Sequence, residues 1–345
     1  MEELLELKNL KTSFKTIRGK VTAVDGVSFS IRKGEIVGVV GESGCGKSVT
    51  SQSIMRLYDE KELVTYEGEI LFEGENIFKK SEKEMESIRG DGIAMVFQDA
   101  LSSLNPLYTV GNQIAEVVLR HGKVKTKKEA YKIAEKMLKL TGIPAPEERV
   151  NSYPHEMSGG MRQRAMIAMA LANEPKLLIA DEPTTALDVT IQAQIMKLIV
   201  DLNKELGMGI MLITHDLGVV AQTCQRVIIM YLGHIVEEGL VTDIFERPLH
   251  PYTIGLIKSI PTLETKKGEK LYMIKGTVPP LSEVQKGCRF CGRCPYATDK
   301  CKEEDPELVT VNDTQKVRCH YAGHISEMAD KDIEYEKSIE NGESC

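Results

Sequence analysis

The chain has 345 residues, with 51 acidic side chains against 44 basic ones and a formal net charge of −7. This balance argues against a protein whose main task is to coat nucleic acid, because binding many phosphates requires a dense basic surface, although it leaves room for one basic face. No run of about 18 uncharged apolar residues occurs, so no membrane-spanning helix is expected. The acidic first residues do not resemble a secretory signal, and the expected compartment is the cytosol.

Short apolar runs predict the strands of a parallel sheet within roughly the first 250 residues. Four runs of strand length are continuous in apolar side chains, at residues 36–40, 177–180, 210–213 and 227–230. Strands that are apolar on both faces belong in the middle of a sheet covered by helices. The predicted fold class is therefore α/β, with crossover helices between parallel strands.

Helical patterns separate the first two of these strands. Thr126 and Glu129 form a capping box, and apolar residues then recur at helical spacing as far as Leu138. We therefore predict a mostly helical insert over about residues 98–172. A further helix is predicted from Thr190, as its N-cap, to about Leu206.

A glycine-rich loop is the first motif that carries chemistry. It follows the strand at 36–40 and matches the pattern G-x-x-x-x-G-K-S over Gly41, Glu42, Ser43, Gly44, Cys45, Gly46, Lys47 and Ser48. The glycines let backbone N–H groups surround a polyphosphate, with Lys47 on the β- and γ-phosphates and Ser48 on Mg²⁺. The motif predicts ATP or GTP binding, against the alternative of a glycine turn without a ligand.

Polar residues at the ends of two further strands suggest hydrolysis. Asp181 and Glu182 end the second apolar run, and His215 ends the third. In this class of site the first acid lies near Mg²⁺ and the second polarises the attacking water. His215 is placed to donate to a γ-phosphate, because open parallel sheets bind ligands at the carboxyl ends of their strands. The alternative is that the two acids cap a turn and that the histidine is a hydrogen-bonded core residue.

One more motif, Ser158-Gly159-Gly160, precedes Asp181. The order of all these motifs resembles the nucleotide-binding subunit of an ABC (ATP-binding cassette) transporter over residues 4 to 250. That family has a P-loop NTPase fold, in which a RecA-like parallel-sheet core carries a helical insert. The sequence departs from the usual signature at Met157 and Met161, where Leu and Gln are commoner.

The resemblance assigns roles to further residues. It implies that the 158–160 signature faces the γ-phosphate held by a second subunit, so that two ATP molecules join two chains and hydrolysis separates them. The other implied positions are Phe14 stacking on adenine, Gln98 sensing Mg²⁺ and the membrane partner, Ala186-Leu187-Asp188 as the D-loop, and His215 as the switch histidine.

Features of the second half resemble a narrower branch, the dipeptide/oligopeptide and nickel importers. They are Asn105-Pro106, His250-Pro251-Tyr252-Thr253 and a group of cysteines. This branch implies a Mg²⁺-dependent ATPase on the cytoplasmic face of the membrane. Its implied partners are a second, non-identical ATPase, two transmembrane permeases and, indirectly, an extracellular substrate-binding protein, without nucleic acid. Peptides are the expected cargo, with nickel chelates or oligosaccharides as alternatives.

Five cysteines lie between residues 288 and 319. Their dense spacing in a reducing compartment predicts a metal site before disulfides. Within the branch named above, the positions of Cys288, Cys294, Cys301 and Cys319 hold a 4Fe–4S cluster. Zinc bound by four cysteines and inert reduced thiols are the alternatives. The extra Cys291 is a bystander or a substitute ligand.

These observations divide the chain into a nucleotide-binding domain at residues 1–255, a C-terminal transporter region with the metal cluster at 256–323, and an acidic tail at 324–345. Two other functions remain open at this point. One is a soluble ABC ATPase that acts on DNA or the ribosome. The other is a binding module that occludes ATP without hydrolysing it, which Glu182 argues against.

Overall fold

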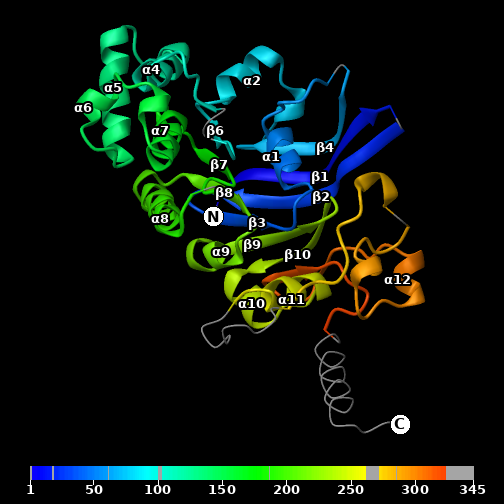
Figure 1. Cartoon of the computed structure of the whole chain (residues 1–345). Helices are drawn as coiled ribbons and strands as arrows, with labels where there is room; N and C mark the ends of the chain where they lie inside the picture. Colours follow the sequence, from blue (N-terminus) through cyan, green and yellow to red (C-terminus); the bar gives the residue numbers. More distant parts are fainter. Residues whose placement is uncertain are drawn as a thin grey trace.

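The computed structural model describes residues 2–17, 19–60, 62–99, 103–185, 187–261, 272–284 and 286–323. The acidic tail predicted at 324–345 lies outside these residues. The predicted α/β class is confirmed: helices pack on a mixed sheet, to which a smaller antiparallel sheet and a helical arm are added (Figure 1). In the part of the chain that is described, no helix combines the length and apolar character needed to span a bilayer.

The main sheet has the strand order β11-β12-β10-β9-β3-β8-β7-β6. Its strands β9, β3, β8, β7 and β6 are parallel, and β10, β12 and β11 extend it antiparallel. All four predicted apolar strands are confirmed and buried. The strand bounds are β3 (Ile36–Val40), β6 (Ile93–Val96), β7 (Leu177–Asp181), β8 (Gly209–Thr214), β9 (Arg226–Tyr231), β10 (His234–Leu240), β11 (Val309–Thr310) and β12 (Gln315–Val317).

A second, antiparallel sheet was not predicted from the sequence. Its order is β2-β1-β4-β5, with bounds β1 (Glu3–Thr16), β2 (Gly19–Arg32), β4 (Val64–Phe72) and β5 (Glu75–Asn76). Its apolar face packs against the main sheet in one core, which joins Leu5 and Ile31 to Val37 and Ile213. Helix α1 (Lys47–Ile54) contacts both sheets, through β1, β2 and β7. Helix α1 is therefore held by strands of both sheets.

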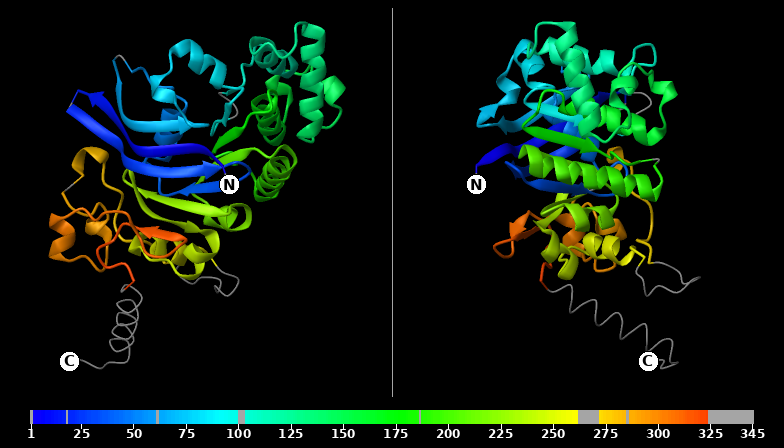
Figure 2. Two further views of the ribbon diagram at one scale, coloured as in Figure 1. Left: turned by 180° about the vertical axis from the view of Figure 1, so that it is seen from behind. Right: turned by 90° about the vertical axis from the view of Figure 1, so that its left-hand side faces the viewer.

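The helices between β6 and β7 form an arm at one side of the main sheet (Figure 2). They are α4 (Val110–Arg120), α5 (Lys127–Leu140), α6 (Pro146–Arg149), η2 (Pro154–Glu156) and α7 (Gly159–Leu171), preceded by η1 (Ile77–Lys79) and α2 (Glu82–Ile88) before β6. The capping box of Thr126 and Glu129 is confirmed at the start of α5. The helical insert predicted between residues 98 and 172 corresponds to α4–α7.

The predicted N-cap of the next helix was wrong by two residues. Helix α8 (Val189–Leu206) begins before Thr190, and the Asp188 carboxylate accepts a hydrogen bond from the Ile191 N–H at 3.0 Å. An N-cap needs an extended backbone and a side-chain acceptor just before the first turn. Asp188 meets both conditions, whereas Thr190 already lies within that turn.

The C-terminal region completes the main sheet. After α9 (Leu217–Thr223), α10 (Val241–Glu246) and α11 (Pro251–Lys258), the chain forms η3 (Leu281–Glu283), η4 (Cys291–Arg293), α12 (Asp299–Glu303) and the hairpin of β11 and β12. Strand β12 pairs with β10, with Glu237 opposite Val317 and Glu238 opposite Lys316. Residues beyond 300 therefore share a sheet with the strands that hold the glycine-rich loop.

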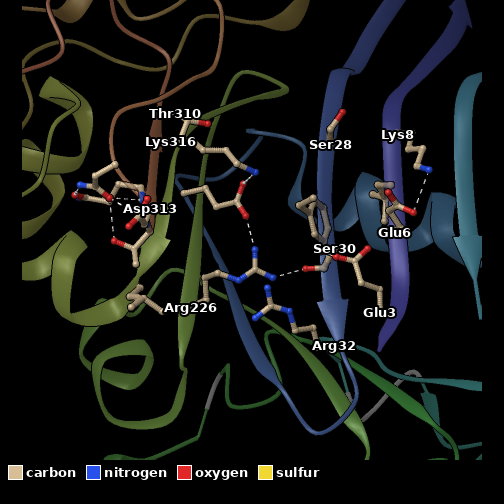
Figure 3. Close-up of a pocket in the computed structure, with 17 residues that line it drawn as sticks. Glu3, Glu6, Lys8, Ser28, Ser30, Arg32, Arg226, Thr310, Asp313 and Lys316 are labelled. Carbon is tan, nitrogen blue, oxygen red and sulfur yellow. Dashed lines mark hydrogen bonds and ion pairs between the residues drawn. The ribbon is translucent and has the colours of Figure 1, made fainter. Parts of the chain in front are cut away.

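Charged side chains join this hairpin to the N-terminal sheet across a hollow of about 540 Å³ (Figure 3). Arg226 lies in the hollow and donates to Glu35 at 3.0 Å, to Glu238 and to the carbonyl oxygen of Ser30. Lys316 from the hairpin contacts the same Glu238 at 3.3 Å. Arg226 and Lys316 are thus both paired with the acidic side chains beside them.

Candidate active site

The glycine-rich loop, residues 41–48, joins β3 to α1, as predicted. Gly46 has φ of 102°, and a Cβ there would lie 2.7 Å from the carbonyl oxygen of Ala23. A Cβ at Gly41 would lie 2.3 Å from the carbonyl oxygen of Met230. Only glycine fits at either position, because the loop passes directly over neighbouring backbone. The loop shape is therefore fixed by contacts with β2 and β9.

Lys47 and Ser48 follow the loop and face the carboxyl end of β7. The Lys47 Nζ is buried and donates to the carbonyl oxygens of Gly41 at 2.7 Å and Glu42 at 3.1 Å. The Ser48 hydroxyl donates to Asp181 Oδ1 at 3.1 Å. Burial raises the pKa of Asp181. A hydroxyl beside a carboxylate offers the oxygen ligands that Mg²⁺ prefers, and a cation there would favour the ionised carboxylate.

The Glu182 carboxylate is where several side chains meet. Its Oε2 accepts from Gln98 Nε2 at 3.0 Å and from the Thr185 hydroxyl at 2.9 Å, and lies 3.4 Å from His215 Nδ1. The structure thus brings together three of the predicted residues, which come from the ends of β6, β7 and β8. Sequence reasoning missed Thr185, although a hydroxyl three residues after a candidate base is a local signal.

The backbone of Glu182 has a conformation that is uncommon for a residue with a side chain. Its φ is 46°, in the left-handed region, and its N–H donates to the carbonyl oxygen of Ile213 at 2.9 Å. Such strained positions persist only where the surrounding structure enforces them, and they gather at functional sites. Here the bond to β8 enforces the turn that points the carboxylate toward Gln98 and His215.

Other predicted residues lie apart from this centre. The half-buried Phe14 packs edge-on against Tyr58, with ring centroids 4.9 Å apart. The Ser158 hydroxyl caps α7 by accepting from the Met161 N–H at 3.3 Å, and Gly159 beside it is exposed. Asp188 caps α8, and Ala186 lies outside the described residues. Within the described ranges, no hydrogen bond or ion pair joins residues 158–160 to the loop at 41–48.

The predicted metal ligands line one pocket but do not converge. Cys288, Cys291, Cys294, Cys301 and Cys319 surround it together with His250, Phe290, Tyr296 and Tyr321. Burial raises the pKa of Cys288 and of Cys294 to about 12, which favours the neutral thiol. The residues that the structure describes contain no group of three or more His, Cys, Asp or Glu side chains that could hold a metal ion. The predicted metal site is therefore not confirmed.

A parallel sheet with a glycine loop between β3 and α1, and with Asp181 and Glu182 at the end of β7, defines a P-loop nucleoside triphosphatase. Comparison with known proteins narrows this class. Residues 24–185 match the family model described as ABC transporter, and residues 236–301 match the one described as Oligopeptide/dipeptide transporter, C-terminal region. The chain belongs to the family of ATP-binding proteins of peptide ABC transporters.

Individual relatives match almost the whole chain. The probable peptide ABC transporter ATP-binding protein y4tR of Sinorhizobium fredii is 54% identical over 93% of this chain and 96% of its own length. The oligopeptide transport ATP-binding protein OppD of Bacillus subtilis is 55% identical over 91% of this chain and 88% of its own length.

A solved structure also matches the fold. It is the cassette MJ0796, described as a dimer in a post-hydrolysis state bound to ADP and phosphate. It is 32% identical, with a TM-score of 0.62 over 69% of this chain and 98% of its own length. The P-loop fold and the ABC ATPase activity predicted from the sequence are thus confirmed. The same matches favour an importer ATPase over a cassette that acts on DNA or the ribosome.

Proposed function

We propose that this chain hydrolyses ATP to power peptide uptake through a membrane importer. It works on the cytoplasmic face, with a second, non-identical ATPase, two permeases and an extracellular binding protein. The observation that carries the proposal is the bond from Gln98 Nε2 to Glu182 Oε2 at 3.0 Å. It joins a residue beside an open groove to the candidate catalytic carboxylate, in a chain whose relatives are named as ATP-binding proteins of peptide transport.

The site residues take the following roles in this proposal. Glu182 orients and polarises the attacking water, while His215 donates to the γ-phosphate. The contacts at the Glu182 carboxylate support this, because a base must be held within hydrogen-bonding reach of its water. Backbone and side chains of Ser43, Gly44, Cys45, Gly46 and Lys47 bind the phosphates, Phe14 stacks on adenine, and Mg²⁺ is held by Ser48, Gln98 and Asp181.

A groove beside Gln98 is where the permease docks. It lies between α2, β6, α4 and α7 and has a volume of about 430 Å³. Met95, Met169 and the exposed Phe97 give it an apolar floor, and charged residues of α2 and α4, such as Glu86 and Arg120, form its rim. An apolar groove with a charged rim suits a short helix of a partner. Phe97 of the groove directly precedes Gln98 in the sequence. A movement of the permease helix in the groove is therefore passed to Glu182 through the hydrogen bond from Gln98.

The signature supports a dimer that ATP holds together. Ser158 and Gly159 are exposed at the beginning of α7, and Ser158 is already used as the N-cap. A helix N-terminus attracts anions through its free N–H groups. Because this end is not joined to the chain's own phosphate loop, it binds the γ-phosphate held by the partner ATPase. Asp188, the N-cap of α8, lies on the same proposed interface.

We also propose that Cys288, Cys294, Cys301 and Cys319 hold a 4Fe–4S cluster. They line one pocket, walled by aromatic side chains, and they are not joined as disulfides. The resemblance to the importer branch in which these four positions hold a 4Fe–4S cluster is what favours the cluster over zinc. When bound, the cluster staples a segment that has little core of its own.

The direct test is uptake of labelled peptides by cells that carry the complete importer. Glu182→Gln is expected to abolish uptake and hydrolysis while ATP binding stays within about twofold of wild type, because only the general base is lost. Glu205→Gln, an exposed carboxylate on α8, is the matched control. Wild-type uptake with Glu182→Gln would contradict the assigned role. Uptake of nickel chelates or oligosaccharides, without uptake of peptides, would contradict the proposal that peptides are the cargo.

A further inference from the structure

The cysteine-rich segment, residues 286–303, contacts the phosphate loop directly. Arg293, which lies between Cys291 and Cys294, donates through Nη1 to Glu42 Oε2 at 2.6 Å and through Nη2 to Glu42 Oε1 at 3.1 Å. Glu42 is the second residue of the loop, next to Gly41. A two-pronged arginine–carboxylate pair is among the strongest polar contacts in proteins, and it fixes geometry as well as distance.

The rest of the arginine is held in place by residues outside the loop. Its side chain is only 7% exposed, and its Nε donates to the carbonyl oxygen of Lys275 at 3.0 Å. The guanidinium also lies over the ring of Tyr231, with 5.8 Å from Cζ to the centroid. Arg293 is therefore a fixed anchor, against which Glu42 is positioned.

The backbone of Glu42 is held by the same part of the chain. Its N–H donates to the hydroxyl of Tyr252 at 2.9 Å. Tyr252 lies on α11, is fully buried, and packs its ring against Phe290 of the cysteine-rich segment with centroids 5.4 Å apart. Both the side chain and the backbone of one loop residue thus depend on residues after 250.

A second arginine of the segment supports the loop indirectly, through the turn between β9 and β10. Arg289 donates to the carbonyl oxygen of Leu232 and pairs with Asp25. The next residue, Gly233, donates its N–H to the carbonyl oxygen of Cys45 at 2.8 Å. The segment therefore supports the loop at its beginning, through Glu42, and at its middle, through the β9–β10 turn.

We propose that Arg293 is a positioning residue for ATP, which holds the phosphate loop in its binding shape through Glu42. A glycine-rich loop loses much conformational freedom when it is ordered around phosphate. Ordering it in advance removes that cost from binding and raises the affinity. The cysteine-rich segment thereby sets the ATP affinity. The inference rests on the proposed role of the loop in binding ATP, but not on the cargo or on the cluster.

The test uses the full-length chain and measures the Kd for ATP, together with KM and kcat. Arg293→Ala and Glu42→Gln are each expected to raise Kd and KM about tenfold, with kcat changed less than about twofold, the size expected for losing one charge-assisted pair. The double variant is expected to be no worse than either single one, because both remove the same contact. Arg293→Lys restores part of the affinity, since lysine makes one of the two bonds.

Lys302→Ala provides the matched control, because Lys302 is an exposed basic residue of the same segment that pairs with Asp299. It is expected to leave the Kd unchanged. If Arg293→Ala does not fold, Glu42→Gln carries the test, because its side chain is 31% exposed on a loop. Unchanged Kd in Glu42→Gln, or additive effects in the double variant, would overturn the proposal. If Lys47→Ala also leaves ATP binding intact, the loop at 41–48 does not bind ATP. Failure of the proposed function is thereby distinguished from failure of the role of Arg293 alone.

Discussion

Gln98 and Glu182 stand 84 residues apart in the sequence, yet Gln98 Nε2 donates to Glu182 Oε2 at 3.0 Å. The contact forms because β6 and β7 are parallel neighbours, with Val96 opposite Ala180, so that the residues after each strand meet at the same edge. The hydrolysis centre and the groove proposed for the permease are therefore joined by a single side chain.

Removing this side chain is expected to uncouple transport from hydrolysis. Gln98→Ala removes one proposed Mg²⁺ ligand but leaves the phosphate loop, Ser48 and Asp181 in place, so ATP binding is expected to stay within about twofold of wild type. Peptide uptake per ATP hydrolysed is expected to fall about tenfold, a size typical of the coupling between two sites, because the link between the groove and Glu182 is lost. The ratio is measured in vesicles that contain the complete importer, with the exposed Gln222→Ala as the control. An unchanged ratio in Gln98→Ala would exclude the coupling role.

The serine of the signature has two separable tasks. Ser158→Ala and Thr126→Ala each remove an N-cap hydroxyl, from α7 and α5, and each is expected to cost about 1 kcal/mol in the free energy of unfolding. Only Ser158→Ala is expected to weaken ATP-dependent association with the partner ATPase, because we propose that Ser158 also binds the γ-phosphate held by that partner. Equal association in the two variants, compared by sedimentation, would leave Ser158 with a capping role alone.

A buried carboxyl predicts a specific pH dependence of stability. Glu237 is fully buried and accepts from the N–H groups of Leu249 and His250, and burial raises its pKa from 4.5 to about 7. Between these values the folded chain keeps a proton that the unfolded chain has lost. The stabilisation from this group is therefore fully present below about pH 4.5 and is lost as the pH rises through 7.

Glu237→Gln removes this titration. The free energy of unfolding of the wild type, minus that of the variant, is expected to fall by about 3 kcal/mol between pH 4.5 and pH 7. Urea unfolding at a series of pH values measures it. The contribution of His250, whose pKa burial lowers to about 3, is present in both proteins and cancels in the difference. A difference that stays constant with pH would show that Glu237 is ionised in the folded chain.

Substitution of a proposed cluster ligand is expected to lower the iron content of the chain, whereas substitution of Cys291 is not. Chain purified without oxygen is expected to contain about four iron and four sulfide per molecule. Cys294→Ser is expected to lose most of both, whereas Cys291→Ser, in the same pocket, keeps them. Zinc in place of iron, or equal losses in the two variants, would contradict the ligand set.

Local patterns in the sequence were sufficient to predict the parallel strands and the phosphate loop. Buried strands such as β3 are continuous apolar runs, and the loop needs glycine at fixed positions. The N-caps Thr126 and Ser158 also depend only on residues nearby in the sequence, because each hydroxyl accepts from an N–H three residues further on. The long strands β1 and β2 escaped prediction because they carry many charged residues and are interrupted by irregular register, as between Leu7 and Leu10.

Contacts between distant charged residues could not be read from the sequence. Nothing near Glu42 indicates that its partner is Arg293, which lies 251 residues away. The same holds for Arg226 and Glu35, and for the pairing of β12 with β10. These contacts depend on which loops the sheet order places side by side, and a single sequence contains no local signal for that order.

The central claim is that the terminal phosphate of ATP, held by the loop at 41–48, joins this chain to its partner ATPase. The most direct measurement is the mass of the complex formed by the Glu182→Gln chain and its partner subunit, with Mg²⁺ and either ATP or ADP. A stable dimer is expected with ATP, and mostly separate chains are expected with ADP. Equal association with the two nucleotides would contradict it.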